Sequence, residues 1–253
     1  MAPALSDLQP QSAPKATAAA QTAIGDGLVA EAQAFADELA AWRHDLHQMP
    51  ELGNSLPQTS AYIQARLTEM DIPFATLVDG SCVVGLVGAG AAAAQGNGVC
   101  TDEQAGTVIM LRGDMDALPV AEESGEPFAS TNGCMHACGH DMHATALLGA
   151  ARMLKAREAE LVDANATVKL LFQPGEECNP GGASLVLAEE PFADYDVRAV
   201  IGEHVEPSLE VGTFGFRAGK YMASSDELWI EVHGTGGHGA CLLYTSDAAD
   251  DTP

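Results

Sequence analysis

Cys138 and three histidines lie within eight residues of this chain, a density of metal-binding side chains that is hard to explain by core packing. The histidines are His136, His140 and His143. Thiolate, imidazole and carboxylate groups are the ligands that bind transition-metal ions. Cys138 and His140 flank a single glycine, which permits a tight backbone turn, so both side chains can converge on one site. Cys138 alone would be interpreted as a buried thiol, but its neighbours favour a metal site.

The other polar residues of this stretch have more than one interpretation. His136 and His143 could support the site or the structure, and neither is assigned as a ligand. Asp141 stands where an apolar helical pattern begins, and a carboxylate there can cap the helix. We place Asp141 among the residues that orient the ligands, with capping as the simpler alternative.

Two later segments supply matching chemistry. Glu176 and Glu177 follow an apolar strand and a Pro-Gly turn. Consecutive side chains in such a segment point in different directions, so one carboxylate can bind metal while the other faces a substrate as general base. Adjacent acids are also common on solvated surfaces. His204 follows a short apolar strand, where a lone histidine is more often structural, and only the other segments make it a candidate ligand.

Asp114 and Asp116 follow the predicted strand Thr107–Leu111. Charged residues at the end of a buried strand need partners. They could orient the ligand histidines, or they could pair with Arg112. The sequence leaves both alternatives open.

Hydrophobic periodicity predicts the elements that must position these residues. Helices are expected at Glu31–His47, Thr59–Met70, His143–Ala159 and Gly182–Glu189, and strands at Cys82–Val87, Thr107–Leu111, Thr167–Phe172, Val197–Ile201 and Leu228–Val232. A Gly/Ala-rich loop is expected at Gly88–Gly106. Alternating strands and helices indicate an α/β layered domain with a mainly parallel or mixed sheet. Sites in such sheets lie beyond the carboxyl ends of strands, where all three candidate segments fall.

The composition excludes several classes of protein. Of 253 residues 47% are hydrophobic, enough to bury a core. Thirty-six acidic residues face eleven Lys plus Arg, for a formal net charge of −25. Such a surface repels nucleic acid and anionic membranes. A saline environment, where salt screens the self-repulsion, is an alternative reason for the acidity.

Six irregularly spaced cysteines do not form the disulfide framework of a small domain, and they indicate a reducing, cytoplasmic setting. Cys134 and Cys138 lack the spacing of a redox dithiol. Residues 1–30 are rich in Ala, Gln, Ser and Pro, show no secretory signal, and are predicted to be a disordered tail. No apolar run reaches the length of a membrane span.

Seven ordered blocks from about Trp42 to Ala240 resemble a known family: RHDLHQMPELG, LRGDMDALPV, MHACGHDMHATALLGAA, LLFQPGEE, EHV, VGTFGFRAG and MASSDELWIEVHGTGGHGA. The family is that of the metal-dependent amidohydrolases, which includes hippurate hydrolase, N-acyl-amino-acid amidohydrolase and the plant auxin-conjugate hydrolases. The resemblance implies a catalytic α/β domain with two divalent ions and a smaller inserted domain that dimerises and acts as a lid. The domains would be a catalytic domain at 31–223 and the start of the lid domain at 224–240.

The resemblance also implies roles for individual residues. Cys138, His140, Glu177 and His204 would bind the two ions, for which zinc, manganese, cobalt or nickel suits the ligand chemistry. Glu176 would be the general base, and His238 would stabilise the oxyanion. The implied reaction is hydrolysis of the amide bond of small N-acyl amino acids by a homodimer. The alternatives are a dipeptidase or carboxypeptidase with the same metal site, or a metal-binding protein without turnover.

The sequence departs from the family pattern after Ala240. Residues 241–253, CLLYTSDAADDTP, show no periodicity and resemble the translation of a sequencing-library adapter. We therefore expect this tail to be non-native and the chain to be the front part of a longer enzyme. Such a fragment lacks a late histidine ligand and most of the lid, so we expect it to be inactive as it stands.

Overall fold

The computed structural model describes residues 18–94, 105–189 and 197–220, together with Met222, Leu228, Ile230, Glu231 and His233. The chain divides into two compact units, Met1–Glu206 and Pro207–Pro253. Every helix and strand among the described residues belongs to the first unit. In the second unit the described residues form turns and irregular backbone.

A five-stranded mixed sheet is the centre of the first unit. Its strands are β1 (Phe74–Leu77), β2 (Cys82–Gly88), β3 (Thr107–Asp114), β4 (Ala166–Gln173) and β5 (Val197–Gly202), in the spatial order β1-β2-β4-β3-β5. β3 pairs in parallel with β4 and with β5, whereas β2 pairs antiparallel with β1 and β4. The prediction of an α/β layered domain with a mixed sheet is confirmed.

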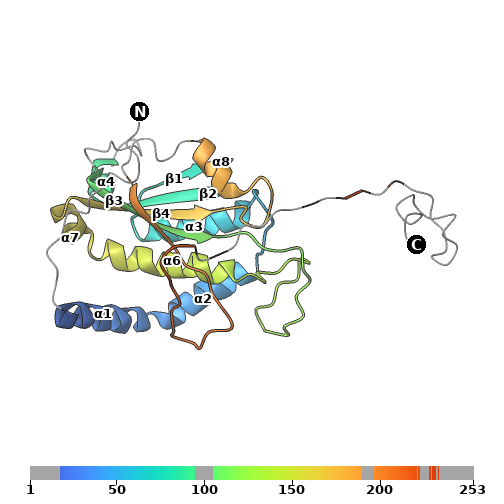
Figure 1. Ribbon diagram of the computed structural model, residues 1–253, viewed down its shortest axis with the longest axis horizontal. Coiled ribbons are helices and arrows are strands. Elements are labelled where there is room, and N and C mark those ends of the chain that lie inside the picture. The colour runs from blue at the N-terminus through green and yellow to red at the C-terminus, as the bar shows by residue number, and fades with distance from the viewer. Residues whose placement is uncertain are drawn as a thin grey trace. The chain divides into compact units, whose positions relative to one another are not determined.

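Helices cover both faces of the sheet, so the central strands are largely buried, and β4 buries the polar residues Thr167, Lys169 and Gln173 beside its apolar ones. β2 is buried along its whole length and β4 from its second residue on. α2 (Ala36–His47), α3 (Pro57–Glu69) and α6 (His140–Lys155) pack on one face, while α8 (Gly182–Ala188) packs on the other (Figure 1). The main core contains Trp42, Leu46, Ile63, Leu67, Leu147, Leu148, Leu170 and Phe172.

β5 is the exception to this burial. It forms one edge of the sheet, and five of its six residues are exposed, Val200 and Ile201 by 62% and 56%. Packing therefore restrains β5 and the residues that follow it less than it restrains β3 and β4.

The helices differ from the predicted ones mainly at their ends. The predicted helix Glu31–His47 is two helices, α1 (Ala18–Gln33) and α2, separated by a turn. Residues 18–30 were assigned to the disordered tail, yet they form most of α1, because Ala, Gln and Glu favour helix. Residues 1–17 lie outside the described residues. The predicted helix His143–Ala159 begins earlier, at His140, and is followed by the separate helix α7 (Glu158–Asp163).

Two short elements were not predicted. The strand β1 has four residues that are all partly or fully exposed, so it shows no apolar pattern. The helix α4 (Ala89–Ala94) lies in the segment expected to be a loop, whose residues 95–104 are not described. The predicted strand Leu228–Val232 falls largely outside the described residues. None of the helices in the described part of the chain has the length and apolar character that crossing a bilayer requires.

Candidate metal centre

The strands β3, β4 and β5 run parallel, so the three polar segments at their carboxyl ends lie together. Asp114 ends β3, Glu176 and Glu177 follow β4, and His204 follows β5. The register aligns Asp114 with Gln173 at the ends of β3 and β4. The fourth segment is the loop that ends at α6, whose first residue is His140. Gly139 precedes the helix with φ of 86°, a left-handed conformation that glycine adopts without strain.

His140 is the central residue of the cluster, because its ring is completely buried and neither ring nitrogen has a hydrogen-bond partner. Its Nε2 lies 3.8 Å from Glu177 Oε1, 3.9 Å from Glu176 Oε2 and 3.8 Å from Asp114 Oδ1. These distances are too long for hydrogen bonds. They match the spacing of roughly 3 to 4 Å between atoms that bind one ion at about 2 Å each.

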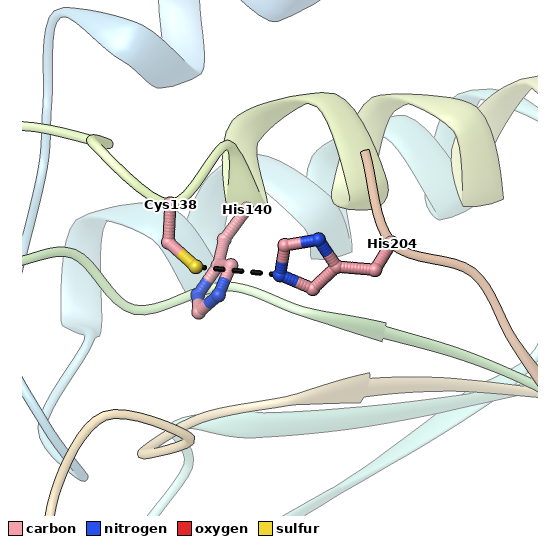
Figure 2. Close-up of side chains that lie close together, drawn as sticks. All are labelled: Cys138, His140 and His204. Atoms are coloured by element: carbon pink, nitrogen blue, oxygen red, sulfur yellow. Dashed lines mark hydrogen bonds between the residues drawn. The ribbon is translucent and has the colours of Figure 1, made fainter. Parts of the chain in front are cut away.

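Cys138 and His204 face each other across the same space. The Cys138 Sγ lies 3.3 Å from the His204 Nε2, and Figure 2 shows both side chains pointing toward each other beside the ring of His140. The His204 Nδ1 lies 2.7 Å from the carbonyl oxygen of Val205. Because a carbonyl oxygen only accepts, Nδ1 carries the hydrogen and the lone pair is on Nε2. Metal-binding histidines commonly donate to a backbone carbonyl in this way.

Asp116 holds Glu176 and Glu177 in place through their backbone N–H groups. Its two carboxylate oxygens accept hydrogen bonds from the N–H groups of Glu176 and Glu177, each at 2.9 Å. Asp116 Oδ1 also lies 3.4 Å from the His140 Nδ1. The side chains of Glu176 and Glu177 are 43% and 25% exposed, so both carboxylates can reach solvent or a ligand.

Asp114 pairs with Arg112, one of the two alternatives that the sequence left open, and its second partner is His143, which was not assigned as a ligand. Arg112 Nη1 donates to Asp114 Oδ2 at 2.6 Å, and Asp114 Oδ1 lies 2.6 Å from the His143 Nδ1. Burial opposes ionisation of Asp114, but the hydrogen bond from His143 and the charge of Arg112 outweigh it and hold the pKa of Asp114 below its ordinary value. Asp114 is therefore a buried carboxylate anion.

The electrostatics of the cluster favour a cation. Burial raises the pKa of the Cys138 thiol to about 12, and the carboxylates of Glu177 and Glu176 add to this rise. Burial lowers the pKa of His140, but Asp116 and Asp114 outweigh it, so that the pKa is raised overall. Excess negative charge is thus concentrated around a thiol and an imidazole. A divalent cation would offset this charge and favour the thiolate that binds it.

Three overlapping groups of side chains have ligand atoms within 4.8 Å of one another. The groups are Cys138–His140–His204, His140–Glu176–Glu177 and Asp114–His140–His143. His140 belongs to all three. Hydrogen bonds occupy both oxygens of Asp114 and both ring nitrogens of His143, so the ligand types for two neighbouring ions come from the other two groups. The residues present fit a dinuclear centre.

Two of the singled-out residues lie beside this cluster, and a third is not described. Asp141 Oδ2 accepts hydrogen bonds from Arg43 Nε at 2.9 Å and from His47 Nδ1 at 2.8 Å, which tie the start of α6 to α2. His136 is buried, and burial lowers the pKa of its imidazole to about 4. His238 lies outside the described residues.

Comparison with known proteins identifies the family. The model of peptidase family M20/M25/M40 matches residues 110–247, more than half of the chain. The chain belongs to this family. The M20 match includes every residue of the cluster described above, from Asp114 to His204.

Relatives of this M20 chain act on N-acyl amino acids. An N-acetyl-L-cysteine deacetylase of Bacillus subtilis is 39% identical over 207 residues, which cover 80% of this chain and 44% of the relative. An N-acyl-L-amino acid amidohydrolase of Geobacillus stearothermophilus is 36% identical, covering 83% of this chain and 52% of the relative. A solved Bacillus subtilis structure, described as a dinuclear metal-binding peptidase of the M20 family, matches with a TM-score of 0.61 and 36% identity over 73% of this chain and 47% of its own. The chain spans about half the length of the relatives it matches.

The sequence did not assign the residues that hold the start of α6 in this M20 chain. His47 lies between Asp141 and the carboxylate of Glu122, whose Oε1 is 3.1 Å from the His47 Nε2. Arg43 and His47 stand in the block RHDLHQMPELG, four residues apart on one helix face. That spacing is a signal that both side chains reach one partner, but it does not say which one.

Proposed function

We propose that this protein is a hydrolase of N-acyl amino acids whose dinuclear metal centre is held by Cys138, His140, Glu177 and His204. The observation that carries the proposal is the buried His140 ring, which has no hydrogen-bond partner and faces carboxylates at 3.8 to 3.9 Å. A buried polar group without a partner is costly, and an ion bound by His140 would remove that cost.

The residues divide into those that hold the ions and those that act on the substrate. When bound, two divalent ions polarise the amide carbonyl and favour ionisation of a water molecule. Glu176 is the proposed general base, because its carboxylate is partly exposed and lies beside His140. It takes a proton from the attacking water and passes it to the leaving amine. His238, as proposed from the family resemblance, donates to the oxyanion.

The substrate class is proposed from the relatives. Three relatives are named as an N-acetyl-L-cysteine deacetylase, an N-acyl-L-amino acid amidohydrolase and, in Arabidopsis thaliana, an IAA-amino acid hydrolase. The last is 36% identical over 87% of this chain. In an N-acyl amino acid, the acyl group is joined to the amino acid by an amide linkage. We propose the same linkage for this protein.

The domain division and the partners are also proposals. A catalytic domain at 31–223, the start of a lid at 224–240 and assembly of a homodimer through that lid rest on the family resemblance. The absence of a disulfide at Cys82, Cys134 and Cys138, which lie among the described residues, supports a proposed reducing, cytoplasmic location.

The test separates metal binding from turnover. Purified protein is dialysed against Co²⁺, and bound metal and the thiolate-to-cobalt absorption band are measured. Release of free amine from N-acetyl and N-benzoyl amino acids is then followed with and without a chelator. For this chain we expect bound metal, a thiolate band that Cys138→Ser removes and Cys134→Ser retains, and no hydrolysis, as expected from the sequence. Hydrolysis that the chelator abolishes is expected of a protein that spans the full length of the relatives. Absence of bound metal overturns the whole proposal, and a full-length protein that binds metal without hydrolysis overturns the proposed reaction.

A further inference from the structure

A chain of hydrogen bonds runs from β3 to the segment after β5, and His143 is its central member. Arg112 donates to Asp114 Oδ2, and Asp114 Oδ1 lies 2.6 Å from the His143 Nδ1. On the other side of the ring, the backbone N–H of Val205 donates to the His143 Nε2 at 2.9 Å. His143 therefore connects a fixed strand end to the residue next to His204.

The partners of His143 define which of its nitrogens carries the hydrogen. A backbone N–H only donates, so the Nε2 must present its lone pair to Val205. The hydrogen is consequently on Nδ1, from which it is donated to Asp114. Both ring nitrogens are committed, and neither has a lone pair free for an ion. His143 is thus not available as the ligand that its position near Asp114 and His140 would suggest.

Val205 is held at three points, and these fix the ring of His204. Its N–H donates a hydrogen bond to the His143 Nε2, and its carbonyl oxygen accepts one from the His204 Nδ1. Its side chain covers the bare Cα of Gly139, where a Cβ would lie only 2.5 Å from the Val205 Cγ2. Because His204 is exposed and the strand before it is an exposed edge, these contacts restrain His204 more than packing does.

We propose that His143 is a positioning residue, which holds Val205 and thereby keeps the His204 Nε2 within reach of an ion shared with Cys138. The inference rests on the proposed function, since it assigns His143 a task in that same centre. Outer partners of metal ligands typically change metal affinity by about 10- to 100-fold when they are removed.

Two substitutions separate the two hydrogen bonds of His143. In His143→Asn the amide nitrogen can take the place of Nδ1 and donate to Asp114, but nothing reaches Val205. In His143→Gln the amide oxygen can take the place of Nε2 and accept from Val205, but the bond to Asp114 is lost. The matched control is His44→Gln, because His44 is half-buried and stacks on Phe128 at 3.8 Å.

Cobalt affinity is measured by titration for each variant. We expect His143→Asn to weaken binding by about 10- to 100-fold. We expect His143→Gln to stay within a few-fold of the wild-type protein, with an unchanged thiolate-to-cobalt band. Equal losses in both variants, with one nitrogen ligand fewer in the cobalt X-ray absorption spectrum, would mean that His143 is a ligand itself. Equal losses that follow a lower urea midpoint would mean a role in folding alone. Either result overturns the proposal.

A measurement without metal distinguishes this proposal from the proposed function. Hydrogen exchange of the Val205 amide should be slow in the wild-type protein and in His143→Gln, and fast in His143→Asn. Nitrogen-15 chemical shifts should show the hydrogen of the wild-type ring on Nδ1. Fast exchange of the Val205 amide in the wild-type protein would contradict the positioning role of His143. Slow exchange in a protein that binds no cobalt would contradict only the proposed metal-dependent function.

Discussion

The two sides of the candidate centre are built differently. On one side, Asp114 ends β3, Asp116 follows it, His140 and His143 belong to α6, and all four side chains are buried. On the other side, His204 follows the exposed edge strand β5 and is itself exposed. The buried side is fixed by packing on both faces of a sheet, and the exposed side by a few hydrogen bonds.

This difference indicates how such a centre can bind both an ion and a substrate. Ligands that packing holds keep their geometry without the ion, so the ion meets a preorganised half-site. A ligand that hydrogen bonds hold can shift at a lower free-energy cost when an ion or a substrate enters. The comparison predicts that substitutions on the two sides differ in size and in kind.

The largest effect is expected for the ligand on the buried side. His140→Ala should weaken metal binding by at least about 100-fold, because His140 contacts every candidate group and water cannot easily replace a fully buried ring. His204→Ala should weaken it by roughly tenfold, since solvent can fill an exposed position. Calorimetric titration with Zn²⁺ checks both variants. Equal losses would show that burial does not rank the ligands.

Asp116→Ala is expected to have the next largest effect, and mainly on stability. The substitution leaves two backbone N–H groups without their carboxylate acceptor, at a cost of about 3 kcal/mol in the free energy of unfolding. Urea unfolding followed by circular dichroism measures this change. Asp163→Ala, at an exposed position on α7, is the control and should unfold at nearly the wild-type midpoint. A loss below about 0.5 kcal/mol for Asp116→Ala would mean that solvent replaces the carboxylate.

Gly139→Ala should act on the exposed side alone. The added Cβ meets Val205 at 2.5 Å, so Val205 and His204 must move away from Cys138, and we expect cobalt affinity to fall about tenfold. Gly133→Ala is a close control, because Gly133 has φ of 84° against 86° for Gly139 but no atom within 4 Å of an added Cβ. Both variants therefore carry the same backbone strain. If both lose the same affinity, strain and not the contact with Val205 is the cause.

The smallest effect is expected for the pH dependence of stability at Glu122, which contacts His47 behind the start of α6. Burial raises the pKa of Glu122, but hydrogen bonds from the Ser124 hydroxyl, the Ser130 N–H and His47 outweigh it and lower the pKa from 4.5 to about 2. The folded chain thus holds this proton less readily than the unfolded chain. The stabilisation by Glu122 is fully present above pH 4.5 and is lost as the pH falls toward about 2.

Glu122→Gln should therefore unfold at a lower urea concentration than the wild-type protein at neutral pH. The difference should shrink as the pH falls from 4.5 toward about 2. The exposed neighbour Glu123→Gln is the control and should show no such pH dependence. A difference that stays constant or grows in acid would contradict the sign of this shift.

The sequence predicted the parts of the fold that have a strong local signal. β2 consists of apolar residues and glycine and β4 is mostly apolar, and their predicted bounds differ from the observed ones by one residue at most at each end. The four residues of β1 and the two residues of the turn that separates α1 from α2 are all partly or fully exposed, and neither segment leaves a pattern of burial. Local signals of this kind end where burial becomes partial.

In the candidate centre too, the sequence showed features with a local signal and missed contacts between distant residues. The ligand types were visible in the motifs, and the parallel strand ends bring them together. The partners were not visible, because hydrogen bonds such as Val205 to His143 and Glu176 to Asp116 join residues about 60 positions apart. The sequence left Asp114 with either Arg112 or a ligand histidine as partner, and the structure gives it Arg112 and the unassigned His143. The ligand assignments themselves stay predictions that the metal titrations will test.

The hydrogen bonds that Asp116 accepts come from peptide groups and not from side chains. Every amino acid except proline has such an N–H group, so the turn at residues 176 and 177 keeps its shape whichever side chains it carries. The side chains of Glu176 and Glu177 can therefore be exchanged, shortened or neutralised while the backbone hydrogen bonds to Asp116 persist. In evolutionary terms, the side chains at residues 176 and 177 can change independently of the backbone turn that Asp116 stabilises. New chemistry at the carboxyl end of β4 therefore requires changes of side chain only.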